Sequence, residues 1–251
     1  MPELTELEAR VYDNGCRMIP HVTHDEQEYE RSRAQYEFCR ELIGADQRSV
    51  PKSERVAILD LGCGVGHGSV LLSTLPDSHV LGIDLSPDAI QYAREHYQRD
   101  NVTYAARDIL DLVRRMDEYD YVVSIGVVEH IEQGFSLLSE LRFRNRMVVS
   151  IPYNEPPGRN ANHCLHSITE GNFTHFQAVE FFYADWDGRI YDTPYLQPSP
   201  LTLISVISKT HMPACPPLPQ VGHCRHGWVR HVARVVSTRL NWWFHSGQDG
   251  R

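Results

Sequence analysis

Three glycines, Gly62, Gly64 and Gly66, stand at alternate positions after the apolar run of residues 56–59 and the acidic Asp60. An unbroken apolar run of this length is typical of a parallel strand that is buried on both faces. A glycine-rich turn after such a strand lets backbone N–H groups approach a ligand closely, because glycine has no Cβ. The stretch therefore predicts a site for a nucleotide-like cofactor.

The spacing of the glycines and the acid before them narrow the choice of cofactor. The dinucleotide-binding pattern is G-x-G-x-x-G. Counted from Gly62, its third glycine would fall on His67, and counted from Gly64 it would fall on Ser69, so the pattern fails. The carboxylate of Asp60 would also repel a pyrophosphate. It suits a cationic ligand such as the sulfonium and ammonium groups of S-adenosyl-L-methionine (SAM).

The run from Asp60 to Gly66, Asp-Leu-Gly-Cys-Gly-Val-Gly, resembles the first motif of the class I SAM-dependent methyltransferases. The resemblance covers residues 33–209 and implies SAM as the cofactor, a seven-stranded sheet and a methyl-transfer activity. A glycine-rich turn that holds no ligand is the alternative to a cofactor site.

Two more acids follow predicted strands. Asp84 ends the strand expected at residues 80–84 and lies 20 residues beyond Gly64. At this distance α/β nucleotide sites place the carboxylate that accepts hydrogen bonds from ribose hydroxyls. Asp108 and Ile109 resemble the family's third motif, in which the acid contacts the adenine amino group and the apolar residue flanks the ring. A helix cap and an ordinary acidic loop are the respective alternatives.

The predicted cofactor site combines these strand ends with a tyrosine from the helix before the first strand. Residues 33–38 resemble a region that many bacterial methyltransferases place over the cofactor, although a packing role explains their aromatic side chains equally well. The predicted cofactor-binding residues are Tyr36, Asp60, Gly62, Gly64, Gly66, Asp84, Leu85, Asp108, Ile109, Ile125 and Gly126.

Histidines are the candidates for chemistry at the methyl acceptor. An acceptor hydroxyl must lose a proton during transfer, and histidine has a pKa that suits a base near neutral pH. We predict His130, after the fourth strand, as that base; the alternative is a histidine that only packs at a helix start. His163 and His166 lie on a long polar loop and are predicted to assist by polarising the acceptor. The predicted acceptor-binding residues are Glu129, Tyr153 and Asn154.

We expect no metal at this site. The run from Gly126 to His130 is similar to an E-x-x-E-H run that binds a divalent metal in relatives of the ubiquinone-pathway O-methyltransferases and the small-RNA 3′-end methyltransferases. Gly126 stands where that run begins with a carboxylate, which leaves too few hard ligands. His163 and His166 have no Cys or acid at a standard zinc spacing to complete a set.

Strands and helices alternate along the middle of the chain, which predicts a doubly wound, Rossmann-like α/β sheet. The resemblance implies seven strands, mostly parallel with one antiparallel, and helices on both faces. Ligands bind at the carboxyl ends of such strands, where the predicted cofactor residues fall. The strands are expected at residues 56–59, 80–84, 101–105, 119–125, 146–151, 181–184 and 201–207, the last two forming an antiparallel hairpin.

We divide the chain into an N-terminal helical cap (residues 1–50), a SAM-binding methyltransferase domain (51–209) and a C-terminal segment (210–251). A capping box formed by Thr23 and Glu26 is expected to open the long helix of the cap, and Gly44 is expected to end it. The C-terminal segment combines a proline-rich linker with an amphipathic helix, whose apolar face is expected to pack on its own domain or on a sister subunit of a homodimer.

Composition restricts the partners. The 251 residues carry a formal net charge of −9, which disfavours a general nucleic-acid binder because phosphate backbones attract clustered Lys and Arg. No apolar run reaches the ~18 residues of a membrane span, and the polar start is no signal peptide. Six cysteines without C-x-x-C spacing indicate reduced thiols in a cytoplasmic protein.

These observations predict a cytoplasmic SAM-dependent methyltransferase that acts on oxygen or nitrogen of a small-molecule acceptor, such as a natural product or a sugar. One alternative is an enzyme of the same fold that methylates RNA or protein, although the acidic composition argues against RNA. The other is a SAM-binding module without transfer activity. A product-forming assay distinguishes such a module from an enzyme.

Overall fold

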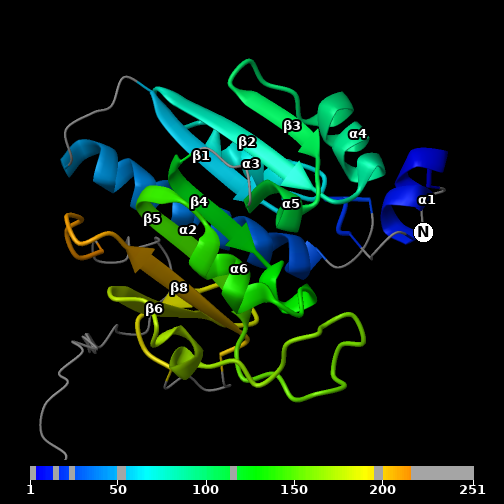
Figure 1. The fold of residues 1–251 in the computed structure, drawn as a ribbon. Coiled ribbons are helices and arrows are strands. Elements are labelled where there is room, and N and C mark those ends of the chain that lie inside the picture. The colour runs from blue at the N-terminus through cyan, green and yellow to red at the C-terminus, as the bar shows by residue number, and fades with distance from the viewer. Residues whose placement is uncertain are drawn as a thin grey trace, which may run out of the picture.

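A computed structural model describes residues 4–13, 17–22, 26–49, 55–113, 118–194 and 200–215. The described chain is built on one eight-stranded sheet with the strand order β3-β2-β1-β4-β5-β8-β6-β7 (Figure 1). Five neighbouring strands run parallel, and their apolar sequences are those of strands covered on both faces. They are β1 (Val56–Leu61), β2 (Ser78–Asp84), β3 (Val102–Ala106), β4 (Tyr119–Ile125) and β5 (Phe143–Pro152).

The predicted antiparallel hairpin is present at the other end of the sheet. Strand β8 (Thr202–Ser208) lies between β5 and β6 (Val179–Ala184) and runs antiparallel to both. An eighth strand, β7 (Ile190–Tyr191), pairs with the end of β6. The prediction of seven strands missed it because two residues are too short to show a strand pattern in the sequence.

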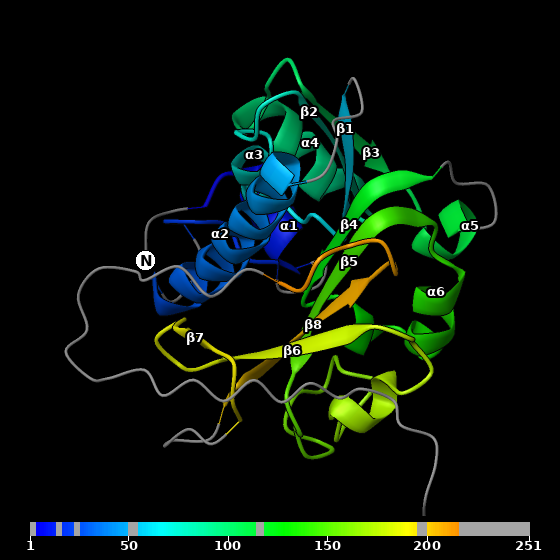
Figure 2. The ribbon, with the colours of Figure 1, turned by 90° about the vertical axis from the view of Figure 1, so that its left-hand side faces the viewer.

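Helices cover both faces of the sheet, as predicted (Figure 2). The first face carries α2 (Glu26–Ser49), α3 (His67–Leu72) and α4 (Pro87–His96), and a core that includes Leu42 and Ile90 lies beneath them. The second face carries α5 (Ile109–Val113) and α6 (Gly134–Glu140) over a separate core. A short N-terminal helix, α1 (Glu6–Asp13), packs on α4.

Helix α2 does not end at Gly44, so that prediction was wrong. It continues to Ser49 because tertiary contacts fix its last turns. Asp46, in one of these turns, is buried and pairs with the fully buried Arg146 of β5, with 2.8 Å between Nε and Oδ2. Ending the helix at Gly44 would withdraw that carboxylate and leave the Arg146 charge unpaired in the interior, which is costly.

Two further expectations concern residues outside the described parts of the chain. Thr23 of the predicted capping box lies outside the described residues, and so does most of the predicted C-terminal segment, from residue 216 onward. Among the described helices, none combines the length and the apolar character that crossing a membrane requires.

Candidate active site

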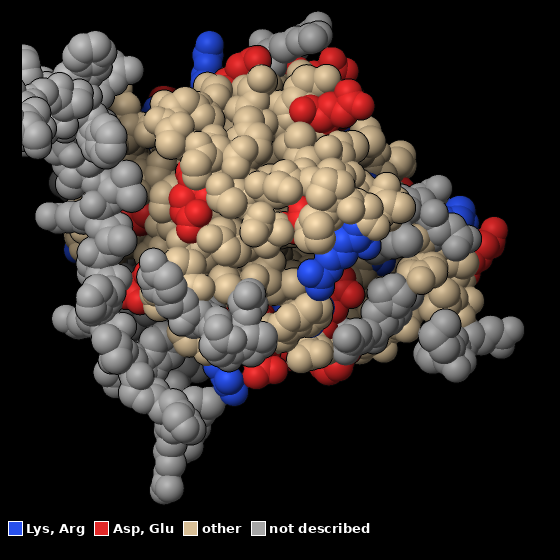
Figure 3. All heavy atoms as spheres, turned by 90° about the horizontal axis from the view of Figure 1, so that it is seen from below, with Lys and Arg blue, Asp and Glu red and all other residues tan. Residues whose placement is uncertain are grey.

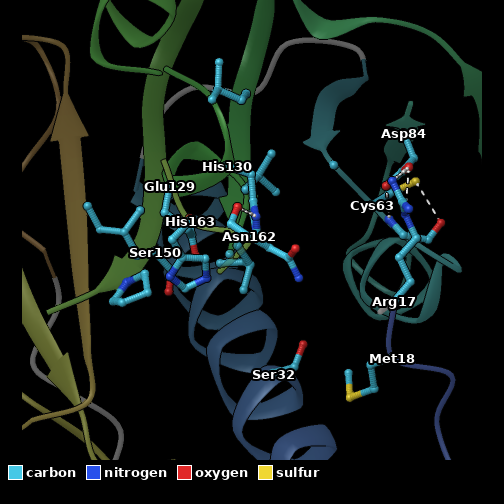
Figure 4. Close-up of a pocket in the computed structure, with 18 of the residues that line it drawn as sticks. Arg17, Met18, Ser32, Cys63, Asp84, Glu129, His130, Ser150, Asn162 and His163 are labelled. Atoms are coloured by element: carbon cyan, nitrogen blue, oxygen red, sulfur yellow. Dashed lines mark hydrogen bonds and ion pairs between the residues drawn. The ribbon is translucent and has the colours of Figure 1, made fainter. Parts of the chain in front are cut away.

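A cavity of about 970 Å³ opens at the carboxyl ends of β1, β2 and β4. Strand β1 lies between β2 and β4, so the chain reverses its direction of progress across the sheet at this point. Doubly wound sheets bind ligands at such a switch point. Helix α2 and the segment around Arg17 and Met18 supply the remaining walls (Figure 4).

The glycine turn after β1 adopts the backbone that its sequence predicts. Gly62 and Gly64 have φ angles of 74° and 53°, in the left-handed region that favours glycine. A Cβ on Gly62 would lie 2.3 Å from Cγ2 of Val127, whereas a Cβ on Gly64 would meet nothing within 4 Å. Gly62 is therefore required by packing. Gly64 presents bare backbone to the cavity, which fits a cofactor that approaches the turn closely.

Asp60 lies behind the cavity wall instead of lining the cavity. Its carboxylate is fully buried and accepts hydrogen bonds from the Tyr36 hydroxyl (3.0 Å) and the Ser69 hydroxyl (2.5 Å). Burial raises the pKa of Asp60 to about 6, against the opposing effect of these two bonds. Asp60 thus holds α2 and α3 against β1, and its predicted contact with the cofactor stays a prediction.

Gly66 is likewise absent from the cavity wall. A Cβ there would lie 2.7 Å from the Tyr104 hydroxyl oxygen, so packing accounts for the glycine. Tyr36 does line the cavity, and its ring lies against Gly68, where a Cβ would come within 2.1 Å of it. The predicted residues that line the cavity are Tyr36, Gly62, Gly64, Asp84, Leu85, Asp108, Ile109, Ile125 and Gly126.

Asp84 sits at the end of β2 with its carboxylate in the cavity wall. The next residues begin α4, where Ser86 caps the helix by accepting a hydrogen bond from the Ala89 N–H (3.2 Å). Asp84 also forms an ion pair with Arg17, with 2.8 Å between Nη2 and Oδ1. Arg17 could not be predicted from the sequence, because no motif surrounds it and it stands 67 positions from Asp84.

The opposite wall of the cavity carries a group formed by Glu129, His130 and His163, which we call the acceptor wall. The carbonyl oxygen of Glu129 accepts hydrogen bonds from the N–H groups of Cys164 (2.7 Å) and Leu165 (3.0 Å). These bonds hold the loop after β5 against the turn after β4. The ring of His163 consequently lies edge-on to that of His130, with 4.8 Å between the centroids (Figure 4).

Neighbouring oxygens fix the tautomers of both rings. Nδ1 of His130 lies 2.9 Å from the carbonyl oxygen of Asn162, which can only accept, so Nδ1 carries the proton and Nε2 the lone pair. Nδ1 of His163 donates to the carboxylate of Glu155, and its Nε2 accepts from the Asn160 amide at 3.0 Å. Burial lowers the pKa of His130, and the charge of Arg17 acts in the same direction, against the opposing effects of the bond to Asn162 and the carboxylate of Glu155. His130 is therefore neutral near pH 7 and able to accept a proton.

Glu129 is 3% exposed, and its Oε2 has no hydrogen-bond partner among the described residues. Burial raises its pKa to about 8, so the group holds a proton at neutral pH. One ligand atom from each residue of the acceptor wall lies within 4.8 Å of the others. This spacing would also suit a divalent ion. Our expectation of no metal considered His163 only together with His166, whereas the fold brings His163 beside Glu129 and His130.

Besides Asp60 and Gly66, three predicted residues lie outside the cavity wall. The Tyr153 hydroxyl lies 3.3 Å from a carboxylate oxygen of Glu170, away from the acceptor wall. Asn154 adopts a φ of 48° and bonds through its N–H to the Ile168 carbonyl, which fixes a turn of the loop. His166 follows the point where the loop is bonded to Glu129, and only His163, before that point, lines the cavity. The residues that we did not predict in the wall include Arg17, Arg31, Gln35, Ser150, Asn160 and Asn162.

The geometry defines the class of protein: a doubly wound α/β fold with a ligand cavity at its switch point. Residues 58–142 match the family model for a methyltransferase domain. The similarity therefore concerns a methyltransferase domain within residues 58–142, and it agrees with the resemblance of the glycine turn to the class I, SAM-dependent methyltransferases.

Two curated relatives are O-methyltransferases. Over 106 residues the chain is 31% identical to malonyl-[acyl-carrier protein] O-methyltransferase of Acetivibrio thermocellus, covering 41% of this chain and 36% of that protein. Over 105 residues it is 29% identical to the mitochondrial ubiquinone biosynthesis O-methyltransferase of Saccharomyces cerevisiae, covering 39% and 33%. The chain therefore spans about a third of the length of these relatives.

A solved structure shows the same fold. The N-terminal domain of EvdMO1, crystallised in the presence of S-adenosylhomocysteine (SAH) and D-fucose, has a TM-score of 0.50 and 16% identity to this chain. The similarity covers 74% of this chain and 84% of that one. At this identity it concerns the fold alone.

Proposed function

We propose that the protein transfers a methyl group from SAM to an oxygen or nitrogen atom of a small-molecule acceptor. The observation that carries this proposal is that one cavity joins the glycine turn and Asp84 to the acceptor wall of Glu129, His130 and His163. SAM supplies an electrophilic methyl group when it is bound. The residues of the chain then have to hold the acceptor atom close to that group and in line with the departing sulfur.

We propose that the cofactor binds to the residues of the cavity wall that lie at the carboxyl ends of the strands. Asp84 accepts hydrogen bonds from the ribose hydroxyls of the cofactor, and Asp108 and Ile109 flank its adenine base. The turn from Gly62 to Gly64 contacts the rest of the cofactor. Five carboxyl groups and two arginines line the cavity, so the carboxyl groups outnumber the arginines even with Glu129 protonated, which suits a cationic cofactor. The carboxyl groups are Glu28, Asp84, Asp108, Glu129 and Glu132, and the arginines are Arg17 and Arg31.

The same charge balance favours a small acceptor over RNA. Affinity for a phosphate backbone depends on clustered Lys and Arg, and the described cavity residues include no Lys. On the face shown in Figure 3, the Lys and Arg side chains of the described residues lie apart, with carboxylates between them. This charge distribution argues against RNA as the acceptor and does not distinguish a small molecule from a protein.

We propose His130 as the base for a hydroxyl acceptor. Its Nε2 lone pair is fixed by the Nδ1 bond to Asn162, and the lowered pKa keeps the ring ready to accept a proton. His163, oriented by Glu155, would hold or polarise the acceptor beside it. A neutral amine acceptor would need no base, and then both rings would only position it.

Binding and turnover are tested separately. Calorimetry with SAM, SAH and NAD should show binding of the first two and none of NAD, because the G-x-G-x-x-G spacing is absent. An assay of SAH release over a panel of hydroxyl and amine acceptors then tests transfer. Binding of SAM without release for any acceptor would favour the module without transfer activity, and NAD binding alone would contradict the proposal.

We also propose a cytoplasmic location and a homodimer. The four described cysteines, Cys39, Cys63, Cys164 and Cys215, are free thiols, which agrees with a reducing compartment. Cell fractionation tests the first, and light scattering of the full chain tests the second.

A further inference from the structure

The carboxylate of Asp84 is already engaged by the protein. Its Oδ1 accepts a hydrogen bond from the Ser86 N–H at 2.8 Å and meets Arg17 at two atoms, Nε at 3.1 Å and Nη2 at 2.8 Å. Its Oδ2 accepts one bond, from the Gly64 N–H at 3.0 Å. The Asp84 side chain is 7% exposed and that of Arg17 is 22% exposed, so solvent screens this ion pair only in part.

Counting acceptor positions shows what this arrangement prevents. A carboxylate oxygen has two lone pairs, so the two oxygens offer about four positions. Three donor atoms already meet Oδ1, whereas Oδ2 has one position left. A ribose presents two neighbouring hydroxyls that bind best with one on each oxygen. Asp84 cannot accept both while the Arg17 guanidinium stays in place.

The segment that carries Arg17 is fastened beside the cofactor turn. Val11 and Ile19, on either side of Arg17, are fully buried in a small core with Val65 of the glycine turn and Tyr92 of α4. An ion pair from Arg10 to Asp88, 3.0 Å from Nε to Oδ1, fixes the preceding helix. These contacts do not involve the guanidinium of Arg17, so its side chain can leave Asp84 without detaching the segment.

We propose that Arg17 is an internal competitor for the ribose-binding carboxylate, and that cofactor binding displaces its guanidinium from Asp84. The proposal rests on the proposed function, because it takes SAM as the ligand of the cavity. The cofactor must break one charge-assisted pair to form its own hydrogen bonds. The measured affinity is therefore lower than the cavity without Arg17 would give.

Competition for the carboxylate differs from simple charge repulsion in a measurable way. SAM and SAH carry the same ribose, but only SAM has the positive sulfonium. Loss of a competitor at Asp84 should strengthen the binding of both ligands equally. Loss of a repelling charge should strengthen the binding of SAM more than that of SAH.

Calorimetry of SAM and SAH with the wild type and Arg17→Ala tests the proposal. We expect both ligands to bind the variant about tenfold more tightly, as removal of a competing conformation predicts. Arg17→Lys keeps the charge but loses the two-pronged contact, so it should gain less. Arg10→Ala is the matched control, because it breaks an ion pair of the same segment outside the cavity. Its affinities should equal those of the wild type.

Thermal unfolding shows whether each variant is folded. If Arg17→Ala is not folded, the test is made with Arg17→Lys. Unchanged or weaker binding of SAH by the folded Arg17 variants would overturn the proposal, and so would a gain confined to SAM. An equal gain in Arg10→Ala would assign the effect to loosening of the segment and would also overturn it. If neither the wild type nor any variant binds SAM or SAH, the proposed function itself is wrong.

Discussion

The two halves of the cavity are built in different ways. Apart from Tyr36 of α2, the predicted cofactor residues in the cavity wall end or follow β1, β2, β3 and β4, so each lies next to an apolar run in the sequence. The acceptor wall joins Glu129 and His130 to His163, which comes from a loop 33 residues beyond His130 and is held by backbone bonds to Glu129. The ends of the strands position the residues of the cofactor half, and contacts between loops position the residues of the acceptor wall. A sequence motif can therefore describe the first half but only part of the second.

The largest expected effect concerns the acceptor wall. His130→Ala should lower kcat by roughly 10²–10⁴-fold for a hydroxyl acceptor, as loss of a general base does, with little change in SAM affinity. His163→Ala should mainly raise KM for the acceptor. Steady-state kinetics with the first acceptor found in the SAH-release assay measure both, and His175→Ala, outside the cavity wall, is the control. Normal turnover in a folded His130→Ala protein would reject the base and favour an amine acceptor.

The next effect concerns the cofactor half. Asp84→Ala removes the carboxylate that is proposed to accept the ribose hydroxyls, and should weaken SAM binding by about 1.5–3 kcal/mol. Calorimetry measures the change, and the near-ultraviolet circular dichroism spectrum checks that the fold is intact. Asp88→Ala, which loses an ion pair with Arg10 outside the cavity wall, is a suitable control. An affinity equal to that of the wild type would remove Asp84 from the ribose site.

A smaller effect follows from the burial of Glu129. Its pKa in the folded protein is raised to about 8 from an ordinary value of 4.5. Between these values the folded state holds a proton that the unfolded state has lost, so the free energy of unfolding should fall as pH rises from 4.5 to 8. Glu129→Gln keeps the shape without the charge and should raise Tm relative to wild type by a few degrees above pH 8.

The comparison that checks this effect is made at low pH. Below pH 4.5, Glu129 is protonated in both states, so the difference in Tm between Glu129→Gln and wild type should shrink. Differential scanning calorimetry at several pH values measures it. A difference that is independent of pH would show that the Glu129 carboxyl is not kept neutral by burial.

The smallest expected effect is that of metal removal. We predict that EDTA leaves kcat unchanged, because the sequence supplies a single carboxylate in the run from Gly126 to His130. The spacing of Glu129, His130 and His163 makes this a sharp test of the acceptor wall. Inactivation by EDTA that Mg²⁺, Mn²⁺ or Zn²⁺ reverses would reassign the two histidines from proton transfer to metal binding.

The sequence by itself determined the parallel sheet and the position of its ligand edge. Apolar runs of β-branched residues specify buried strands, and the chain direction of parallel strands brings their carboxyl ends to one edge. Asp84 and Asp108 could therefore be placed beside the Gly62 to Gly64 turn without coordinates. The resemblance to methyltransferases rests on the same motif, and residues 58–142 match the family model for a methyltransferase domain.

Only the tertiary structure decided which polar groups face the cavity. Asp60 belongs to the motif, yet hydrogen bonds from Tyr36 and Ser69 turn it into the core. Arg17 belongs to no motif, yet the packing of Val11 and Ile19 brings it onto Asp84. In both cases the decisive contacts join residues far apart in the chain. The spacing of residues in the sequence can predict where a strand ends. The direction in which a side chain points depends on the distant residues that pack against it.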